Sequence, residues 1–319
     1  MGTALLEPPS LLPGARVALV SPAGPLAGRH ELEHAMANAT AMGWAPVAGT
    51  HALSRDGYFA GDDAARAHDL LEALTDPTIA GIWCLRGGYG AARLLPSISV
   101  ELVRAHPKTL IGYSDITALH ALWQRAGLVS YHGPTARAAL TDFTRASLVE
   151  TMGNVPRASV HALTMPDATT LRTGAATGRL AGGNLALVAS LCGTPWAIDF
   201  RGAIVVLEDI GEATYRLDRM LLQLWLAGAF DGCAGLLLGQ FTNCTSESDD
   251  GARTISAVMT EFASRAGVPA VLGAPVGHVA DQWTLPLGAV ATLDATTRTL
   301  RIHRAHEEFL TLTDTGAER

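Results

Sequence analysis

The side chain best placed for covalent chemistry is that of Ser114, in the stretch 111–117, which reads IGYSDIT. An apolar run precedes it and a helical pattern follows, and a sharp strand-to-helix turn exposes such a residue at the carboxyl end of a sheet. The backbone N–H of Asp115 then lies at a helix N-terminus, where the helix dipole favours a developing negative charge. This pattern predicts a nucleophile, although Ile116 occupies the position of the second glycine in the usual G-x-S-x-G turn. The simpler alternative is that Ser114 only caps the next helix.

A glycine-rich loop at 85–90, LRGGYG, is the second feature that indicates a catalytic or binding role. It also follows an apolar run, and its glycines allow backbone N–H groups to approach a ligand closely. It lacks the lysine of a phosphate-binding P-loop and the G-x-G-x-x-G spacing of a dinucleotide site. We therefore expect a second oxyanion donor from Gly88, with an ordinary strand-to-helix turn as the alternative.

A nucleophilic serine needs a histidine base within reach. His278 is the favoured candidate because it ends an apolar stretch at a glycine, in APVGH. His132, which ends the next predicted strand, is a competitor or a supporting group. His120 lies about two turns into the helix after Ser114 and is expected to point away from it.

The base in turn needs an acid that orients it. Glu208 and Asp209 both follow the apolar run 203–207, at the end of a predicted strand. A carboxylate there is either catalytic or a cap for the next helix, and the residues alone do not choose between Glu208 and Asp209.

A zinc site is the competing chemistry, because His30, Glu31 and His34 match H-E-x-x-H. The spacing places both imidazoles on one helix face. However, no later helix presents an obvious third ligand, so we expect a solvated helix start and no metal.

Short apolar runs alternate with helical patterns over the first 150 residues and would position these groups. This order predicts an α/β fold with a doubly wound parallel sheet. Strands are expected at 16–20, 44–48, 79–85, 109–111 and 128–131, and helices at 29–42, 62–74 and 115–125.

Two domains are expected, because 319 residues exceed the size at which one core usually stops growing. We predict an N-terminal nucleophile domain at 1–153, a linker at 154–176 and a C-terminal domain at 177–319. The second domain is predicted to be mixed α+β or barrel-like, and the polar tail after Glu307 to be loosely held. Its strands are expected at 203–207, 235–238, 284–293 and 299–303, and its helices at 184–191, 214–226 and 252–266.

Composition argues against several classes of partner. A net charge of −7 without a basic run argues against a nucleic-acid surface. The sequence shows neither a signal-peptide pattern nor an apolar run long enough for a membrane span. The cysteines are Cys84, Cys192, Cys233 and Cys244, and the first three lie in apolar stretches. None forms a C-x-x-C pair, so we expect reduced cysteines of a cytosolic protein. We expect no metal, no cofactor, no nucleic acid and no membrane.

Taken together, the motifs resemble the LD-carboxypeptidase family, whose members include muramoyltetrapeptide carboxypeptidases and the microcin-C immunity amidases. The matching stretches occur in the order of the family and cover nearly the whole chain. They are 21–24 (SPAG), 57–61 (GYFAG), 86–90 (RGGYG), 112–115 (GYSD), 182–185 (GGNL), 207–209 (LED) with 215–220 (YRLDRM), and 277–278 (GH) with 285–288 (LPLG).

The resemblance implies Ser114 as nucleophile, His278 as base and Glu208 as the orienting acid, with Gly88 and Asp115 as oxyanion donors. It implies an N-terminal domain like the class I glutamine amidotransferases. It also implies acyl transfer without a cofactor, a homodimer, and a cytoplasmic role in recycling cell-wall peptides by release of terminal D-alanine. An aminoacyl-nucleotide amidase with the same triad is the alternative, and a non-enzymatic ligand-binding protein is a more remote one.

The chain departs from the family at Val279 and Gln282, where glycine and asparagine are common. These departures leave the substrate more open than the triad. Arg86, Tyr89 and Arg216 are candidates for holding an anionic peptide substrate, although each arginine could equally form a structural ion pair.

Overall fold

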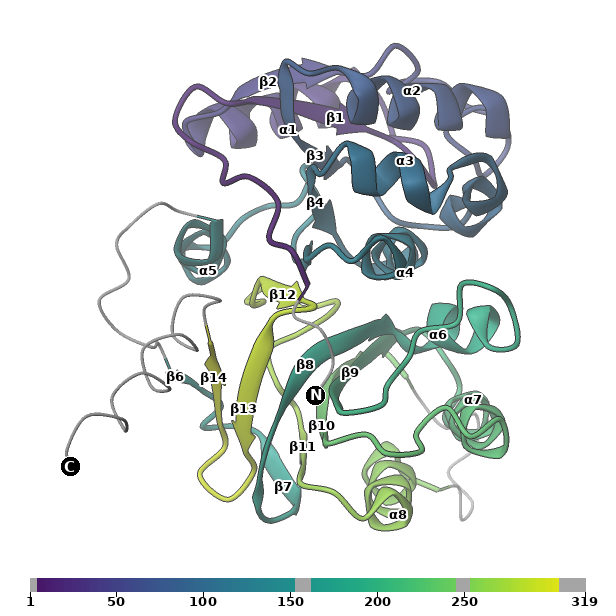
Figure 1. Cartoon of the computed structure of the whole chain (residues 1–319), viewed down its shortest axis with the longest axis vertical. Helices are drawn as coiled ribbons and strands as arrows, with labels where there is room; N and C mark the ends of the chain where they lie inside the picture. Colours follow the sequence, from purple (N-terminus) through teal and green to yellow (C-terminus); the bar gives the residue numbers. More distant parts are fainter. Residues whose placement is uncertain (1–4, 153–161, 245–252, 304–319) are drawn as a thin grey trace, which may run out of the picture.

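The computed structural model describes residues 5–152, 162–244 and 253–303. Its first sheet is the predicted doubly wound sheet, with helices on both faces (Figure 1). Five of its six strands are parallel, and the last is antiparallel at one edge. The strand order is β12 (Leu285–Leu287), β5 (Ser130–His132), β4 (Thr109–Gly112), β3 (Ile79–Cys84), β1 (Arg16–Val20) and β2 (Ala45–Ala48).

Helices cover both faces of this sheet because alternate strand residues are apolar on both sides. Leu19 and Trp83 belong to the apolar cluster that includes residues of α1, whereas Val20 and Ile82 belong to the cluster of α2 and α4. The helices are α1 (Arg29–Ala41), α2 (Asp63–Thr75), α3 (Val100–Ala105), α4 (Thr117–Ala126) and α5 (Asp142–Met152), with short 3₁₀ turns η1 (Ala91–Ser97) and η2 (Ser114–Ile116).

The second sheet has eight strands, with a parallel centre and antiparallel flanks. Three helices accompany it: α6 (Leu185–Leu191), α7 (Thr214–Leu226) and α8 (Ile255–Ala266). The strand order is β6 (Ala162–Thr164), β14 (Thr299–Ile302), β13 (Val290–Asp294), β8 (Ala175–Asn184), β9 (Ala203–Ile210), β10 (Gly235–Thr242), β11 (Ala270–Leu272) and β7 (Thr169–Arg172).

The mixed α/β architecture with two sheets agrees with the sequence prediction, but three details differ. The described part of the predicted linker, 162–176, forms β6, β7 and the start of β8. The single strand expected at 284–293 is two strands in different sheets, because Gly288 turns the chain at φ +100°. Within the described residues β6 and β7 are opposite edges with no pairing between them, so a barrel-like closure is not seen.

The domain boundaries remain predictions. The linker residues 153–161, the start of the helix predicted at 252 and the tail after Glu307 lie outside the described residues. Among the described helices, none is both long enough and apolar enough to cross a membrane.

Strand β12 connects the two sheets. Its backbone pairs with β5 in the first sheet, with Leu285 opposite His132. The side chain of Leu285 is fully buried in the apolar cluster of the second sheet, together with Leu180 and Val206. Figure 1 shows β12 at the junction between the two sheets. Packing at Leu285 therefore fixes how the two halves of the chain meet.

We expect Leu285→Ala to lower the free energy of unfolding by about 2–5 kcal/mol, because it leaves a cavity in a closed cluster. Urea denaturation measures this loss. Leu222→Ala, at a position 42% exposed on α7, is the control and should change stability by less than about 0.5 kcal/mol. Equal effects of the two substitutions would contradict the role assigned to β12.

Candidate active site

Ser114 sits in a turn that few side chains adopt. Tyr113 is extended, and Ser114 follows with φ +65°, a left-handed conformation that is costly for a residue other than glycine. The residue at the N-cap of α4 is Ile116, and Ser114 makes no capping hydrogen bond there. The capping alternative is therefore wrong, and the turn leaves the serine hydroxyl half-buried rather than tied to the helix.

The glycine loop lies directly against this turn. A Cβ on Gly87 would come within 3.0 Å of the Ser114 Cβ and 3.1 Å of its Oγ. The same position is 3.4 Å from the backbone nitrogen of Asp115. Gly88, the next residue, is exposed and has φ +114°. Only a glycine at position 87 lets the two backbones approach this closely.

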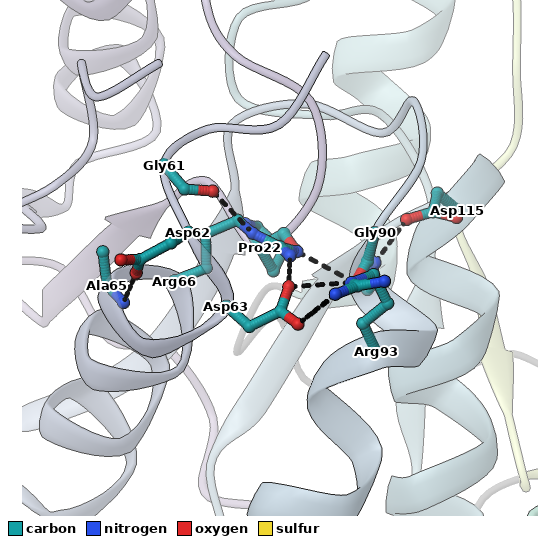
Figure 2. A network of polar contacts seen from close by, with 10 residues as sticks. Pro22, Gly61, Asp62, Asp63, Ala65, Arg66, Gly90, Arg93 and Asp115 are labelled. Atoms are coloured by element: carbon teal, nitrogen blue, oxygen red, sulfur yellow. Dashed lines mark hydrogen bonds and ion pairs between the residues drawn. The ribbon is translucent and has the colours of Figure 1, made fainter. Parts of the chain in front are cut away.

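A buried arginine fixes the shape of the glycine loop (Figure 2). Arg66 is 1% exposed and donates hydrogen bonds to the carbonyl oxygens of Pro22, Gly61 and Gly90. It also pairs with Asp63, which Arg93 binds from the solvent side. One guanidinium thus serves three backbone carbonyls, of which that of Gly90 also accepts from the backbone nitrogen of Arg93.

Asp115 holds the other end of the loop with its side chain. Its Oδ2 accepts a hydrogen bond of 2.7 Å from the backbone nitrogen of Ala91 (Figure 2). Burial raises the pKa of Asp115 to about 6, against the opposing effects of this hydrogen bond and of Arg66. The side chain therefore ties the serine turn to the loop, whereas its backbone N–H remains at the start of the turn.

Glu208 and His278 form the closest acid–base pair of this region. His278 Nδ1 lies 2.8 Å from Glu208 Oε2, and Glu208 is fully buried in β9. Burial alone would raise the pKa of Glu208, but the imidazoles of His132 and His278 hold it at about 2. Gly277, with φ +108°, makes the contact possible, because a Cβ there would come within 2.5 Å of Glu208 Oε2.

Asp209, which the sequence left open as the acid, has other partners. Its Oδ1 accepts hydrogen bonds from Asn184 Nδ2 (2.9 Å) and from its neighbour's backbone nitrogen, and its Oδ2 accepts from Ala186 at the start of α6. Burial raises its pKa to about 6. Glu208 rather than Asp209 therefore faces the histidine.

Tyr113 places His278 near the serine turn. Its ring centroid lies 4.8 Å from that of His278, and Tyr113 is the residue immediately before Ser114. Burial raises the pKa of the Tyr113 hydroxyl, which the side chain of Gln282 also contacts. Gln282, one of the two departures from the family pattern, is 3% exposed and supports this ring.

His120 does not point away from the serine turn as expected. It is buried, and its Nε2 lies 2.9 Å from the carbonyl oxygen of Gly112, while its Nδ1 lies 2.9 Å from Ser130 Oγ. Burial lowers the pKa of His120 to about 3, so the ring is neutral and supports the end of β4. The helical spacing alone did not show which strand the ring would meet.

The predicted substrate-binding side chains lie at three different places. Arg86 donates to the carbonyl oxygen of Pro25 at 2.6 Å. Tyr89 is 52% exposed, and its ring packs beside those of Tyr58 and Phe59. Arg216 is half-exposed on α7, where it contacts neighbouring residues of its own segment. The geometry leaves the substrate roles of all three as predictions.

The H-E-x-x-H residues do not form a metal cluster in the described structure. Glu31 accepts hydrogen bonds from Ala27 and Arg137 instead. Among the described residues, the group whose ligand atoms gather is His51, His68 and Asp69. Here His51 Nδ1 lies 2.7 Å from Asp69 Oδ1. That spacing is typical of a hydrogen bond, since ligands of one tetrahedral zinc lie about 3.3 Å apart.

Comparisons with known proteins agree with one another. The profile of the LD-carboxypeptidase N-terminal domain matches residues 17–133, and that of the LD-carboxypeptidase C-terminal domain matches residues 177–293. A probable murein peptide carboxypeptidase of Bacillus subtilis is 34% identical over 95% of this chain and 96% of its own. The murein tetrapeptide carboxypeptidase of Pseudomonas aeruginosa is 33% identical over 88% and 93%.

Solved structures show the same architecture. The muramoyltetrapeptide carboxypeptidase of Oxalobacter formigenes superimposes with a TM-score of 0.80 at 30% identity, covering 90% of this chain and 97% of its own. The microcin C7 self-immunity protein MccF superimposes with a TM-score of 0.85 at 23% identity, covering 94% and 98%. At that identity the second likeness is one of fold.

The dependence of the glycine loop on Arg66 gives a stability prediction. Arg66→Met keeps an unbranched side chain but removes the donor to the carbonyl oxygens of Pro22 and Gly61, at a cost of about 1–3 kcal/mol each. We expect the free energy of unfolding, measured in urea, to fall by at least about 2 kcal/mol. Arg93→Met removes an exposed partner of the same Asp63 and should cost no more than about 1 kcal/mol. Equal losses would show that Arg66 acts only as a surface charge.

The raised pKa of Asp209 gives a pH prediction. Between about pH 4 and pH 6 the folded state keeps a proton on Asp209 that the unfolded state has lost, so stability falls as the pH rises through this window. In the Asp209→Asn variant we expect the free energy of unfolding to fall less steeply over this window, by up to about 1.4 kcal/mol per pH unit. Thermal unfolding followed from pH 4 to pH 7 measures the slope. An unchanged slope would rule out a buried proton on this carboxyl.

Proposed function

Because this chain belongs to the LD-carboxypeptidase family, we propose that it cleaves an L,D-peptide bond and releases the terminal D-alanine of muramyl tetrapeptides derived from the cell wall. The enzyme class, a serine-type carboxypeptidase, follows from the family. The substrate is proposed from what the relatives are named for. The observation that carries the proposal is the buried Glu208–His278 pair next to the strained turn at Ser114.

In the proposed reaction, Ser114 is the nucleophile and His278 the general base. Glu208 accepts a hydrogen bond from Nδ1–H of His278, which keeps the proton on Nδ1 and leaves Nε2 able to take the proton of the serine hydroxyl. Ser114 Oγ attacks the carbonyl carbon of the penultimate residue. The C–N bond breaks, His278 returns the proton to the amine, and D-alanine leaves.

The backbone N–H groups of Gly88 and Asp115 are proposed to stabilise the oxyanion of the tetrahedral intermediate. The close approach of Gly87 to Ser114 supports this assignment. A water molecule activated by His278 then attacks the acyl-enzyme, and the serine is released with its proton. Ser114, His278 and this water account for every proton in the sequence of steps, so the proposal includes no metal and no cofactor.

The proposal has a cytoplasmic setting and a homodimeric assembly, both implied by the resemblance to the family. It also treats the first sheet as a relative of the class I glutamine amidotransferase fold. The five parallel strands with helices on both faces are compatible with that relationship.

An aminoacyl-nucleotide amidase is the less favoured function. Its substrate would offer a base for stacking, and Trp196 and Trp283 are the aromatic candidates for that contact. Trp283 is 3% exposed within the apolar cluster of the second sheet, and Trp196 packs against the core of the first. Both side chains are explained by packing.

We expect Ser114→Ala to lower kcat for D-alanine release from muramyl tetrapeptide by about 10⁴- to 10⁶-fold, because the acyl-enzyme cannot form. A coupled D-amino-acid oxidase assay measures the release. Ser190→Ala, at an exposed position of α6, is the control and should keep full activity. A loss of only a few-fold in Ser114→Ala would contradict the nucleophile.

The same assay separates the alternatives. Turnover of an aminoacyl sulfamoyl-adenylate, without turnover of the tetrapeptide, would favour the amidase. Loss of activity in EDTA together with full activity of Ser114→Ala would favour zinc chemistry at His30 and His34.

A further inference from the structure

His132 is a buried imidazole that the proposed reaction does not use. It ends β5 and lies between Gly112 of β4 and Leu285 of β12. Its side chain is fully buried, and neither ring nitrogen has a hydrogen-bond partner in the described part of the chain. Buried polar groups without partners are uncommon in folded proteins, so this one calls for a physical reason.

The ring faces the acid of the proposed triad. His132 Nε2 lies 3.9 Å from Glu208 Oε1, and that oxygen also lacks a hydrogen-bond partner among the described residues. The other oxygen, Oε2, binds His278. If a water bridged His132 Nε2 and Glu208 Oε1, these two atoms would lie about 4.5–5 Å apart. The observed distance of 3.9 Å is shorter, so it favours a direct hydrogen bond in which the two atoms move closer together.

The groups around His132 determine which nitrogen carries its proton. The ring of His120 lies 6.1 Å away and is neutral, with its pKa lowered to about 3 by burial first and then by His132. The ring of Tyr113 lies 6.0 Å away. His278 binds the other carboxylate oxygen of Glu208, Oε2. Glu208 is the anion of this set, so an N–H on Nε2 has an acceptor, whereas Nδ1 faces no acceptor among the described residues.

We propose that His132 is a positioning residue: its imidazole donates from Nε2 to Glu208 Oε1 and orients the carboxylate so that Oε2 faces His278 Nδ1. The inference rests on the proposed function, because it assigns Glu208 as the orienting acid. His132 lies in the first sheet and Glu208 in the second. The contact can therefore orient the Glu208 carboxylate only when the two sheets pack against each other.

Three substitutions of His132 test this role. The amide nitrogen of Gln reaches close to the position of Nε2, whereas that of Asn stays near Nδ1 and Leu offers no donor. We expect His132→Leu and His132→Asn to lower kcat by about 10- to 100-fold, which corresponds to one hydrogen bond to a charged group. KM should change by less than about threefold. His132→Gln should keep kcat within about threefold of the wild type.

A double-mutant cycle distinguishes positioning from a merely structural role. In a Glu208→Gln background we expect His132→Leu to cost less than about threefold in kcat, because His132 acts through Glu208. Equal losses in both backgrounds would overturn the proposal, as would full activity of His132→Leu. If the Leu variant does not fold, equal activity of the Gln and Asn variants overturns it instead.

The outcomes also separate this inference from the proposed function. Absence of D-alanine release by the wild-type protein counts against the function itself. Release by the wild type, with unchanged kcat in His132→Leu, counts only against the role of His132.

Discussion

The arrangement of the site depends on one buried charge. Glu208 is fully enclosed in β9, and an unpaired carboxylate there would be strongly unfavourable. The imidazole of His278 at 2.8 Å satisfies one of its oxygens, and the surroundings keep its pKa near 2. A buried anion of this kind holds a histidine in one tautomer and one orientation, which is what a general base requires.

Several features of the chain allow the contact between Glu208 and His278. Position 277 must be a glycine, because a Cβ there would collide with the carboxylate of Glu208. Tyr113, the residue before the serine, packs against His278. Strand β12 pairs at the edge of the first sheet, while its Leu285 packs in the apolar cluster of the second. The serine turn follows β4 of the first sheet, whereas the histidine lies in the loop that leads from β11 of the second sheet to β12 of the first, and the same packing holds both. On this account the site is complete only when the two sheets meet.

Much of this arrangement could be predicted from local sequence patterns. The parallel strands of the first sheet, the turn at Ser114 and the glycine loop all have short-range signals in the spacing of apolar residues and glycines. The choice of Glu208 over Asp209 had no such signal, because both carboxylates follow one strand and only tertiary contacts separate them. The resemblance to the family favoured Glu208, and its catalytic role remains a proposal.

Other features depend on contacts between distant segments. Nothing near Arg66 in the sequence shows that its guanidinium reaches Pro22 and Gly90, more than twenty residues away on each side. The split of 284–293 into β12 and β13 depends on which sheet each end can pair with, which periodicity does not encode. The prediction for His120 was wrong for the same reason, since helix geometry gives a direction but not the neighbour that fills it.

We propose that Ser114 is a nucleophile activated by His278 and by Glu208, which lies in the second sheet. Labelling with a fluorophosphonate, followed by peptide mass spectrometry, tests it most directly. We expect a single adduct on Ser114, formed much more slowly in Glu208→Gln than in the wild type. An adduct on another residue, or a rate of labelling that does not depend on Glu208, would contradict it.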